Sequence, residues 1–311
     1  MSFGFVISIA LFGYFFNAVA ALFDKYLLAD RIKAPAVYAF YVAMFSLFAL
    51  FFVPFKFGFF GWQPTLFAFF SGIIFLYALV ALYTAFKKYE VSRVAPLVGT
   101  VTSITAFFFA FFSGTTLGST IFLALAFLIF GGLLISFDLP LKKNEHIPFF
   151  PILLAGVGIG ISLILLKQGY EENNFVSGLV WSRLGIFVGG ITLLSFAPFR
   201  HQILDHSQET TTDPGRARKT GVYFVLSKVC AGIGSFLVVY AISRGSVALV
   251  QALSGMQYLF LLLLALPLSL RFPALFDERL FFWDWFQKGC AIVLIGIGLW
   301  LSAQSGVTLL L

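Results

Sequence analysis

Two basic residues stand inside long apolar stretches, where a charge must either bind an anion or find a partner. Lys228 lies in FVLSKVCAGIGSFLVVY, residues 224–240, and Arg183 lies in FVSGLVWSRLGIFVGG, residues 175–190. At the centre of a membrane helix such a residue costs roughly 2.5–3.5 kcal/mol on insertion scales. We interpret both as a cationic lining for an anionic substrate group. The alternatives are an internal ion pair, a structural arginine, or a lysine that reaches the membrane interface.

Polar residues at helical spacing indicate which side chains accompany these cations. Gly232 and Ser235 follow Lys228 at i+4 and i+7 and share its face, and Asn17 lies at mid-depth of the first apolar stretch. We therefore predict that Lys228 faces a water-accessible cavity, and that Lys228→Met folds normally but loses affinity for an anion. The predicted substrate-binding residues are Lys228, Arg183, Asn17, Gln251, Ser254, Tyr258 and Ser235.

Asp24 ends the polar stripe of the first apolar stretch, after Gly13, Asn17 and Ala20. It is a candidate coupling carboxylate that binds a proton, and the alternative is a boundary residue beside Lys25. No metal site or cofactor is expected. Asp205 with His201 and His206 is only a weak metal motif, and we interpret these three residues as solvated.

The composition indicates that these residues belong to an integral membrane protein. Hydrophobic residues make up 60% of the 311 residues and charged residues only 11%, against roughly 25% charged in soluble domains. The apolar residues form stretches of about 18–25, which is the length that crosses a hydrocarbon core. The net charge of +7 is scattered over short loops, so we expect no nucleic-acid partner.

The predicted fold is all-α, with ten transmembrane helices arranged as two inverted five-helix repeats. The only sizeable hydrophilic segment, RHQILDHSQETTTDPGRARKT, is predicted to be a mobile loop. The ten apolar stretches lie near residues 4–24, 35–54, 64–86, 94–113, 118–137, 149–167, 176–198, 220–242, 246–270 and 281–303.

The repeat is detectable in the sequence. AFKKYEVSRVAPLVG (85–99) aligns without gaps on AISRGSVALVQALSG (241–255) with five identities. Because each half has an odd number of spans, the second half must be inverted relative to the first, as in many secondary transporters. The predicted divisions are a first repeat at 1–140, a linker at 141–148, a second repeat at 149–303 and a tail at 304–311.

The same segments resemble a known family. AFKKYEVSRVAPLVGTVTSITAFFFAFFSG followed by TIFLALAFLIFGGLLIS, and the second copy that begins AISRGSVALVQALSG, are similar to EamA-like members of the drug/metabolite transporter superfamily. FDERL, before the last stretch, also resembles that family, whereas GTTLGS in the first half lacks the acidic and basic pair of Glu278 and Arg279. The resemblance covers nearly the whole chain. It implies a ten-helix carrier with a central cavity.

The basic residues predict the orientation. Loops after odd-numbered spans hold fifteen Lys or Arg residues and loops after even-numbered spans hold three. The positive-inside rule therefore places both termini outside the cytoplasm, in a multi-pass protein of the cytoplasmic membrane. Members of the resembled family usually keep both termini inside.

The predicted function is secondary transport of a small anionic metabolite by alternating access. An enzyme is not expected, because HExxH, GxSxG and paired intramembrane carboxylates do not occur. The alternative is a translocator of an anionic lipid head group such as a polyprenyl phosphate. The expected partners are the substrate and the bilayer, with a proton or a counter-substrate as the coupling species, and the oligomeric state is left open.

Overall fold

The computed structural model describes most of the chain. The described residues are 3–32, 34–55, 57–59, 61–89, 91–112, 119–136, 149–172, 175–209, 214–244, 250, 253–271 and 282–304. They are almost all helical, and no strand occurs among them.

The helices follow one another with short connections. The first two helices each continue in a different helical geometry: a wider π-helical turn, η1, follows α1, and a tighter 3-10 helix, η2, follows α2. In chain order the elements are α1 (Phe3–Tyr26), η1 (Leu27–Arg31), α2 (Pro35–Ser46), η2 (Leu47–Phe52), α3 (Trp62–Lys88), α4 (Val91–Phe112), α5 (Ser119–Ser136), α6 (Phe149–Glu172), α7 (Phe175–Leu193), α8 (Ala197–Glu209), α9 (Pro214–Arg244), α11 (Ser254–Arg271) and α12 (Phe282–Gln304).

Six helical segments within the described residues are long and apolar enough to cross a membrane. They are Phe5–Arg31, Pro35–Phe52, Trp62–Lys88, Phe149–Tyr170, Phe175–Leu193 and Arg218–Ile242. The protein is therefore helical and has the character of a membrane protein, as its composition predicts. Helices α4, α5, α11 and α12 lie where the other four spans are predicted, but the full set of ten spans stays a prediction.

The surface of the helices supports this membrane character. Large apolar side chains are exposed on many helices, with Phe12 64% exposed, Phe112 81% and Phe150 74%. Soluble monomers rarely leave so many large apolar groups uncovered. A lipid environment accounts for the abundance of phenylalanine.

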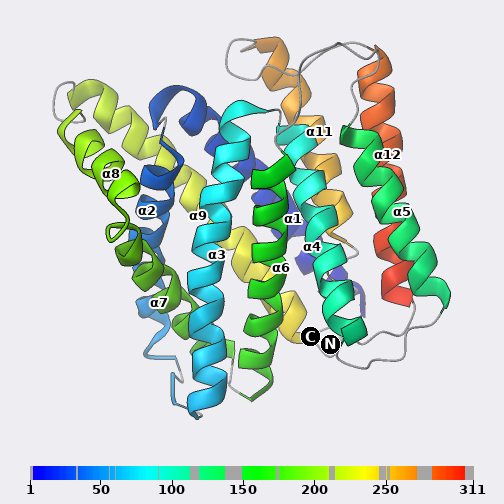
Figure 1. Cartoon of the computed structure of the whole chain (residues 1–311), viewed down its shortest axis with the longest axis horizontal. Helices are drawn as coiled ribbons and strands as arrows, with labels where there is room; N and C mark the ends of the chain where they lie inside the picture. The colour runs from blue at the N-terminus through cyan, green and yellow to red at the C-terminus, as the bar shows by residue number, and fades with distance from the viewer. Residues whose placement is uncertain are drawn as a thin grey trace.

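The helices are arranged side by side (Figure 1). α3, α6 and α4 run next to one another, with α2, α7 and α8 at one edge and α5 and α12 at the other. The closest backbone packing joins α3 to α6 and α7, α1 to α9, and α5 to α12. Each of these contacts pairs a helix from residues 1–136 with one from residues 149–304.

Glycines permit this close packing. A Cβ at Gly156 would collide with the side chain of Val101 on α4, and a Cβ at Gly185 would collide with the backbone carbonyl of Phe69 on α3. Small residues let membrane helices approach each other to the distance of backbone contact. Gly156 and Gly160, like Gly185 and Gly189, are four residues apart, a spacing of small residues from which the sequence predicts close helix packing, and the contacts confirm that prediction.

The predicted loop between the seventh and eighth spans, residues 200–220, is wrong at both ends, because residues 197–209 form α8 and residues 214–220 belong to α9. Pro198 suits the first turn of a helix, where no N–H donor is required. Ile203 is only 6% exposed, and Phe199 packs against the hydrophobic core. One face of α8 is thus held by apolar contacts that include α2, which explains why this polar segment is ordered.

Candidate functional site

The structure joins Asp24 of α1 to Lys228 of α9 in an ion pair. Lys228 Nζ lies 2.9 Å from Asp24 Oδ1, and the two side chains are only 9% and 10% exposed. The residues are 204 positions apart, so the pair connects two distant parts of the chain. Because both charges are removed from solvent, each depends on the other for its stability.

Two further donors complete the surroundings of the carboxylate. The Tyr38 hydroxyl, from the first turn of α2, and the Ser227 hydroxyl, beside Lys228 on α9, each donate to Asp24 Oδ1 at 2.5 Å. One carboxylate oxygen therefore accepts three hydrogen bonds. Charge-assisted bonds of this kind are shorter and stronger than neutral ones.

Aromatic rings surround the ammonium. Lys228 Nζ lies 4.6 Å from the ring centroid of Tyr38, 5.5 Å from that of Phe224 and 5.7 Å from that of Tyr83. Rings at these distances attract a cation through their negative faces. We call Asp24, Lys228, Tyr38, Ser227, Tyr83 and Phe224 the ion-pair cluster.

Lys25 does not share the partner of its neighbour. Its Nζ donates to the carbonyl oxygens of Phe86 and Tyr89, both at 2.8 Å, at the end of α3. A cation at a helix C-terminus satisfies free carbonyls and opposes the helix dipole. Asp24 is thus positioned by Lys228 and its hydroxyl donors, and not by the boundary role that Lys25 fills.

The polar stripe predicted on α1 faces α9. Gly13 packs against Val238, Asn17 packs against Gly234, and Asp24 bonds to Lys228. Asn17 is half-buried at this helix crossing. The stripe of the first span therefore forms the interface with α9.

The predicted face of α9 differs from the observed one. Gly232 is exposed, and no atom lies within 4 Å of a Cβ built on it. Ser235 donates to the carbonyl oxygen of Ala231, 2.6 Å away in its own helix. Ser227 and Gly234 lie on the side that meets α1, because the crossing of the two helices selects a contact face rotated from the stripe that begins at Lys228.

Ser254 and Tyr258 lie together on α11 and are both buried, at 9% and 7% exposure. The Tyr258 hydroxyl packs against Gly99 of α4. They lie outside the ion-pair cluster. Gln251 falls outside the described residues.

Arg183 is also separate from the ion-pair cluster. It is half-buried on α7, and its backbone carbonyl accepts a hydrogen bond of 2.9 Å from Ser46 of α2. The structure thus brings together Asp24 and Lys228 among the predicted residues, with Asn17 further along the same interface.

The sequence analysis missed several buried polar residues. Tyr38 and Ser227 carry no spacing signal, because each becomes significant only when α2, α1 and α9 meet. Arg93 and Lys288 are two of the fifteen basic residues that the orientation prediction counts with the loops, but they lie in α4 and α12 and are 6% and 2% exposed. Both are near the beginning of a helix, where hydropathy alone does not separate a loop residue from a buried one.

The weak metal motif gains no support from the described residues, where no three His, Cys, Asp or Glu side chains gather around a common point. His201 lies exposed on α8. The side chains of Asp205 and His206 fall outside the described part.

No protein-family model matches the chain, and no curated protein matches its sequence significantly.

Proposed function

We propose that this protein is a secondary transporter for a small anionic metabolite. The observation that carries the proposal is the Asp24–Lys228 ion pair, buried between α1 and α9. Ionisable residues inside membrane spans are costly, and they commonly mark substrate and ion pathways.

The pair suggests a way to couple binding to movement. An anionic substrate that reaches Lys228 replaces Asp24 as the partner of the ammonium. Asp24 then lacks its cation, and its buried negative charge is neutralised by binding a proton or a different cation. Substrate and coupling species would thus compete for the same two side chains, and such competition is what links their movements.

The pairing of helices supports an arrangement of two inverted five-helix repeats. If α1 to α5 correspond to α6, α7, α9, α11 and α12, the close contact of α1 with α9 has its counterpart in that of α6 with α3. The contact of α1 with α11 likewise matches that of α6 with α4, and α4 with α5 matches α11 with α12. This symmetry agrees with the repeats proposed at 1–140 and 149–303 and with an EamA-like carrier.

One pair of contacts breaks the symmetry. α3 packs on α7 at backbone distance through Gly185, whereas no comparably close backbone packing of α2 on α9 occurs in the described residues. Between α2 and α9 the contact is made by aromatic rings. The ring centroid of Phe224 on α9 lies 5.9 Å from that of Tyr41 and 5.2 Å from that of Phe45, both on α2. We infer that the two interfaces exchange roles during alternating access, α2 closing on α9 as α3 separates from α7.

We further propose that the end of the bundle holding the ion-pair cluster faces the cytoplasm and that both termini lie outside. Lys87 and Lys88 end α3 and Arg218 and Lys219 begin α9 at this upper end (Figure 1). Positive residues of short loops are retained on the cytoplasmic side.

Cysteine labelling tests this orientation. In a variant without Cys230 and Cys290, a cysteine at Thr211 should react with an impermeant maleimide only after the cells are permeabilised. Phe59→Cys in the same background, at the opposite end of the bundle, should react on intact cells. Labelling of the Thr211 cysteine on intact cells would reverse the proposed orientation.

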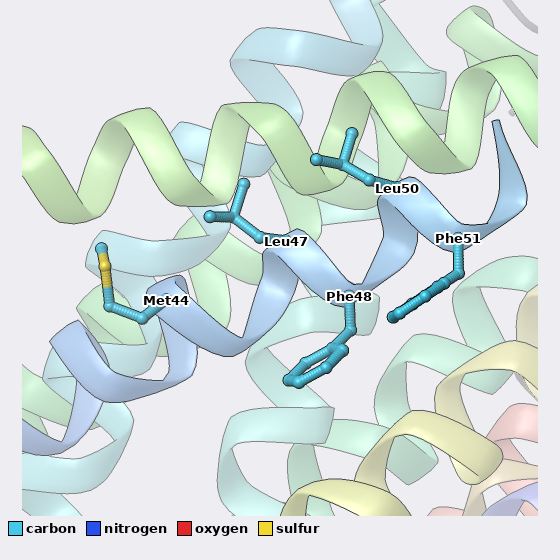
Figure 2. Close-up of a pocket in the computed structure, with 5 residues that line it drawn as sticks. All are labelled: Met44, Leu47, Phe48, Leu50 and Phe51. Carbon is cyan, nitrogen blue, oxygen red and sulfur yellow. The ribbon is translucent and has the colours of Figure 1, made fainter.

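A groove favours the lipid-translocator alternative. It has a volume of about 450 Å³ and is lined by the apolar side chains Met44, Leu47, Phe48, Leu50 and Phe51. Figure 2 shows Leu47 and Leu50 on one side of η2 and Phe48 and Phe51 on the other. An apolar groove beside lipid-exposed rings suits an acyl or polyprenyl chain whose head group enters the protein.

Reconstitution distinguishes the two functions. Proteoliposomes should take up at least one compound from a panel of labelled inorganic phosphate, carboxylates and sugar phosphates, with saturation and with exchange against unlabelled compound inside. The double variant Asp24→Asn/Lys228→Met should lose that uptake. Translocation of a fluorescent polyprenyl phosphate without any uptake would favour the lipid function. Failure of both assays by folded protein would contradict the transport proposal.

A further inference from the structure

At the end of the bundle away from the ion-pair cluster, three side chains hold buried hydrogen-bond donors that have no partner among the described residues. Thr65 Oγ1 on α3, the Tyr170 hydroxyl on α6 and Trp181 Nε1 on α7 are buried, and none makes a hydrogen bond within the described residues. Thr65 as a whole is only 5% exposed. Buried polar groups are nearly always satisfied, so several orphans in one region call for a ligand or ordered water.

Packing contacts bring these groups to one junction of three helices. Gly169, next to Tyr170, packs against Ala68 of α3, and the ring of Tyr170 lies 2.5 Å from a Cβ built on Gly178 of α7. These contacts fix the ends of α6 and α7 against the beginning of α3.

Helical geometry places the other two residues at the same level. Gly185 contacts the backbone of Phe69. Thr65 precedes Phe69 by four residues, and Trp181 precedes Gly185 by four. Each therefore lies about one helical turn from that contact, toward the N-terminus of its helix, on the facing sides of α3 and α7. Gly178, under the Tyr170 ring, is three residues before Trp181 and belongs to the same side.

Arg183 supplies a charge near this junction from the other side of α7, because it is two residues, or about 200° around the helix, from both Trp181 and Gly185. Only its long side chain can reach toward the junction. Its guanidinium makes no hydrogen bond or ion pair with the part of the chain that the structure describes, and it lies within electrostatic reach of the Tyr170 hydroxyl. Side chains of a helix lean toward its N-terminus, which on α7 is the end nearest Tyr170. An unpaired arginine halfway along a membrane helix is costly unless it is used.

The four groups share one chemical property. A guanidinium and an indole N–H can only donate hydrogen bonds, and the two hydroxyls can donate as well. We propose that Arg183, Tyr170, Trp181 and Thr65 form a binding site for one anionic oxygen group, a carboxylate or a phosphate. The fork of the arginine matches the paired oxygens of either group.

The site deepens the transport proposal and rests on it for the class of substrate. Thr65 and Tyr83 are 18 residues apart on α3, which corresponds to about 27 Å along the helix. The donor site and the ion-pair cluster therefore lie toward opposite ends of the bundle. An anion bound first by Arg183 and then by Lys228 would occupy two successive binding sites on one transport pathway.

Equilibrium binding to the purified protein tests the site without transport. With labelled inorganic phosphate and succinate as probes in detergent, Arg183→Gln should weaken binding of at least one probe tenfold or more. Tyr170→Phe should weaken it several-fold with the charge preserved, and Arg183→Lys should restore part of the loss. Protein in nanodiscs with and without polyprenyl phosphate shows whether a lipid head group competes for the site.

Matched controls separate the outcomes. Arg200→Gln removes the same charge from an exposed position on α8 and should leave binding unchanged. Unaltered binding in both Arg183→Gln and Tyr170→Phe, or equal loss in Arg200→Gln, would overturn the site. If Arg183→Gln does not fold, Tyr170→Phe and Trp181→Phe decide the question. Binding lost in these variants without uptake in proteoliposomes would retain the site and reject transport.

Discussion

Lys228→Met is expected to destabilise the folded protein by about 3–5 kcal/mol, because it leaves Asp24 as a buried carboxylate without its cation. The hydroxyl donors Tyr38 and Ser227 remain but do not neutralise the charge. Unfolding by SDS in mixed micelles, followed by circular dichroism, measures the loss. This result reverses the expectation from the sequence, where Lys228 has no visible partner and Lys228→Met is predicted to fold normally.

The double variant separates the fold from the function. Asp24→Asn/Lys228→Met removes both charges, and a buried pair replaced by neutral groups is often tolerated. Its stability should return to within about 1 kcal/mol of the original protein, whereas uptake should remain absent. Lys219→Met, at an exposed position of the same helix, should change neither property. A double variant as unstable as Lys228→Met would show that the pair contributes little and that the lysine stem or another contact matters instead.

Gly185→Ala is expected to cost about 3 kcal/mol, at the upper end of the range for overpacked cores. The added Cβ would meet the carbonyl oxygen of Phe69, which belongs to the backbone of α3 and cannot rotate away. The two helices must therefore separate along their length, and contacts of buried neighbours such as Ile186 are weakened. SDS unfolding and the yield of folded protein measure the effect.

Gly232→Ala is the matched control. No atom lies within 4 Å of a Cβ at this position, and the helix gains about 0.5–1 kcal/mol from the lower chain entropy of alanine. The two substitutions add the same methyl group to membrane helices and should change stability in opposite directions. Equal effects would mean that helix propensity, and not the contact of α3 with α7, determines the outcome.

The sequence alone determined the environment of the protein and the places where its helices lie. Length of apolar stretches, charge content and the spacing of small residues are local properties, and they predicted a helical membrane protein and the glycine packing face at Gly185. The sequence also singled out Lys228, as a charge within an apolar stretch, and Asp24, as the carboxylate at the end of the polar stripe of the first stretch. It failed for residues 197–209, where α8 depends on contacts with other helices more than on its own polar composition.

Only the tertiary structure decided which charges are neutralised and which are not. Asp24 and Lys228 are 204 residues apart, and their meeting depends on the crossing of α1 and α9, which no local pattern encodes. The same crossing turns Ser227 inward and Gly232 outward, although both lie within one turn or so of Lys228. Helical periodicity gives the residues that share a face but not the direction of that face, because the direction is set by packing against helices far away in the sequence.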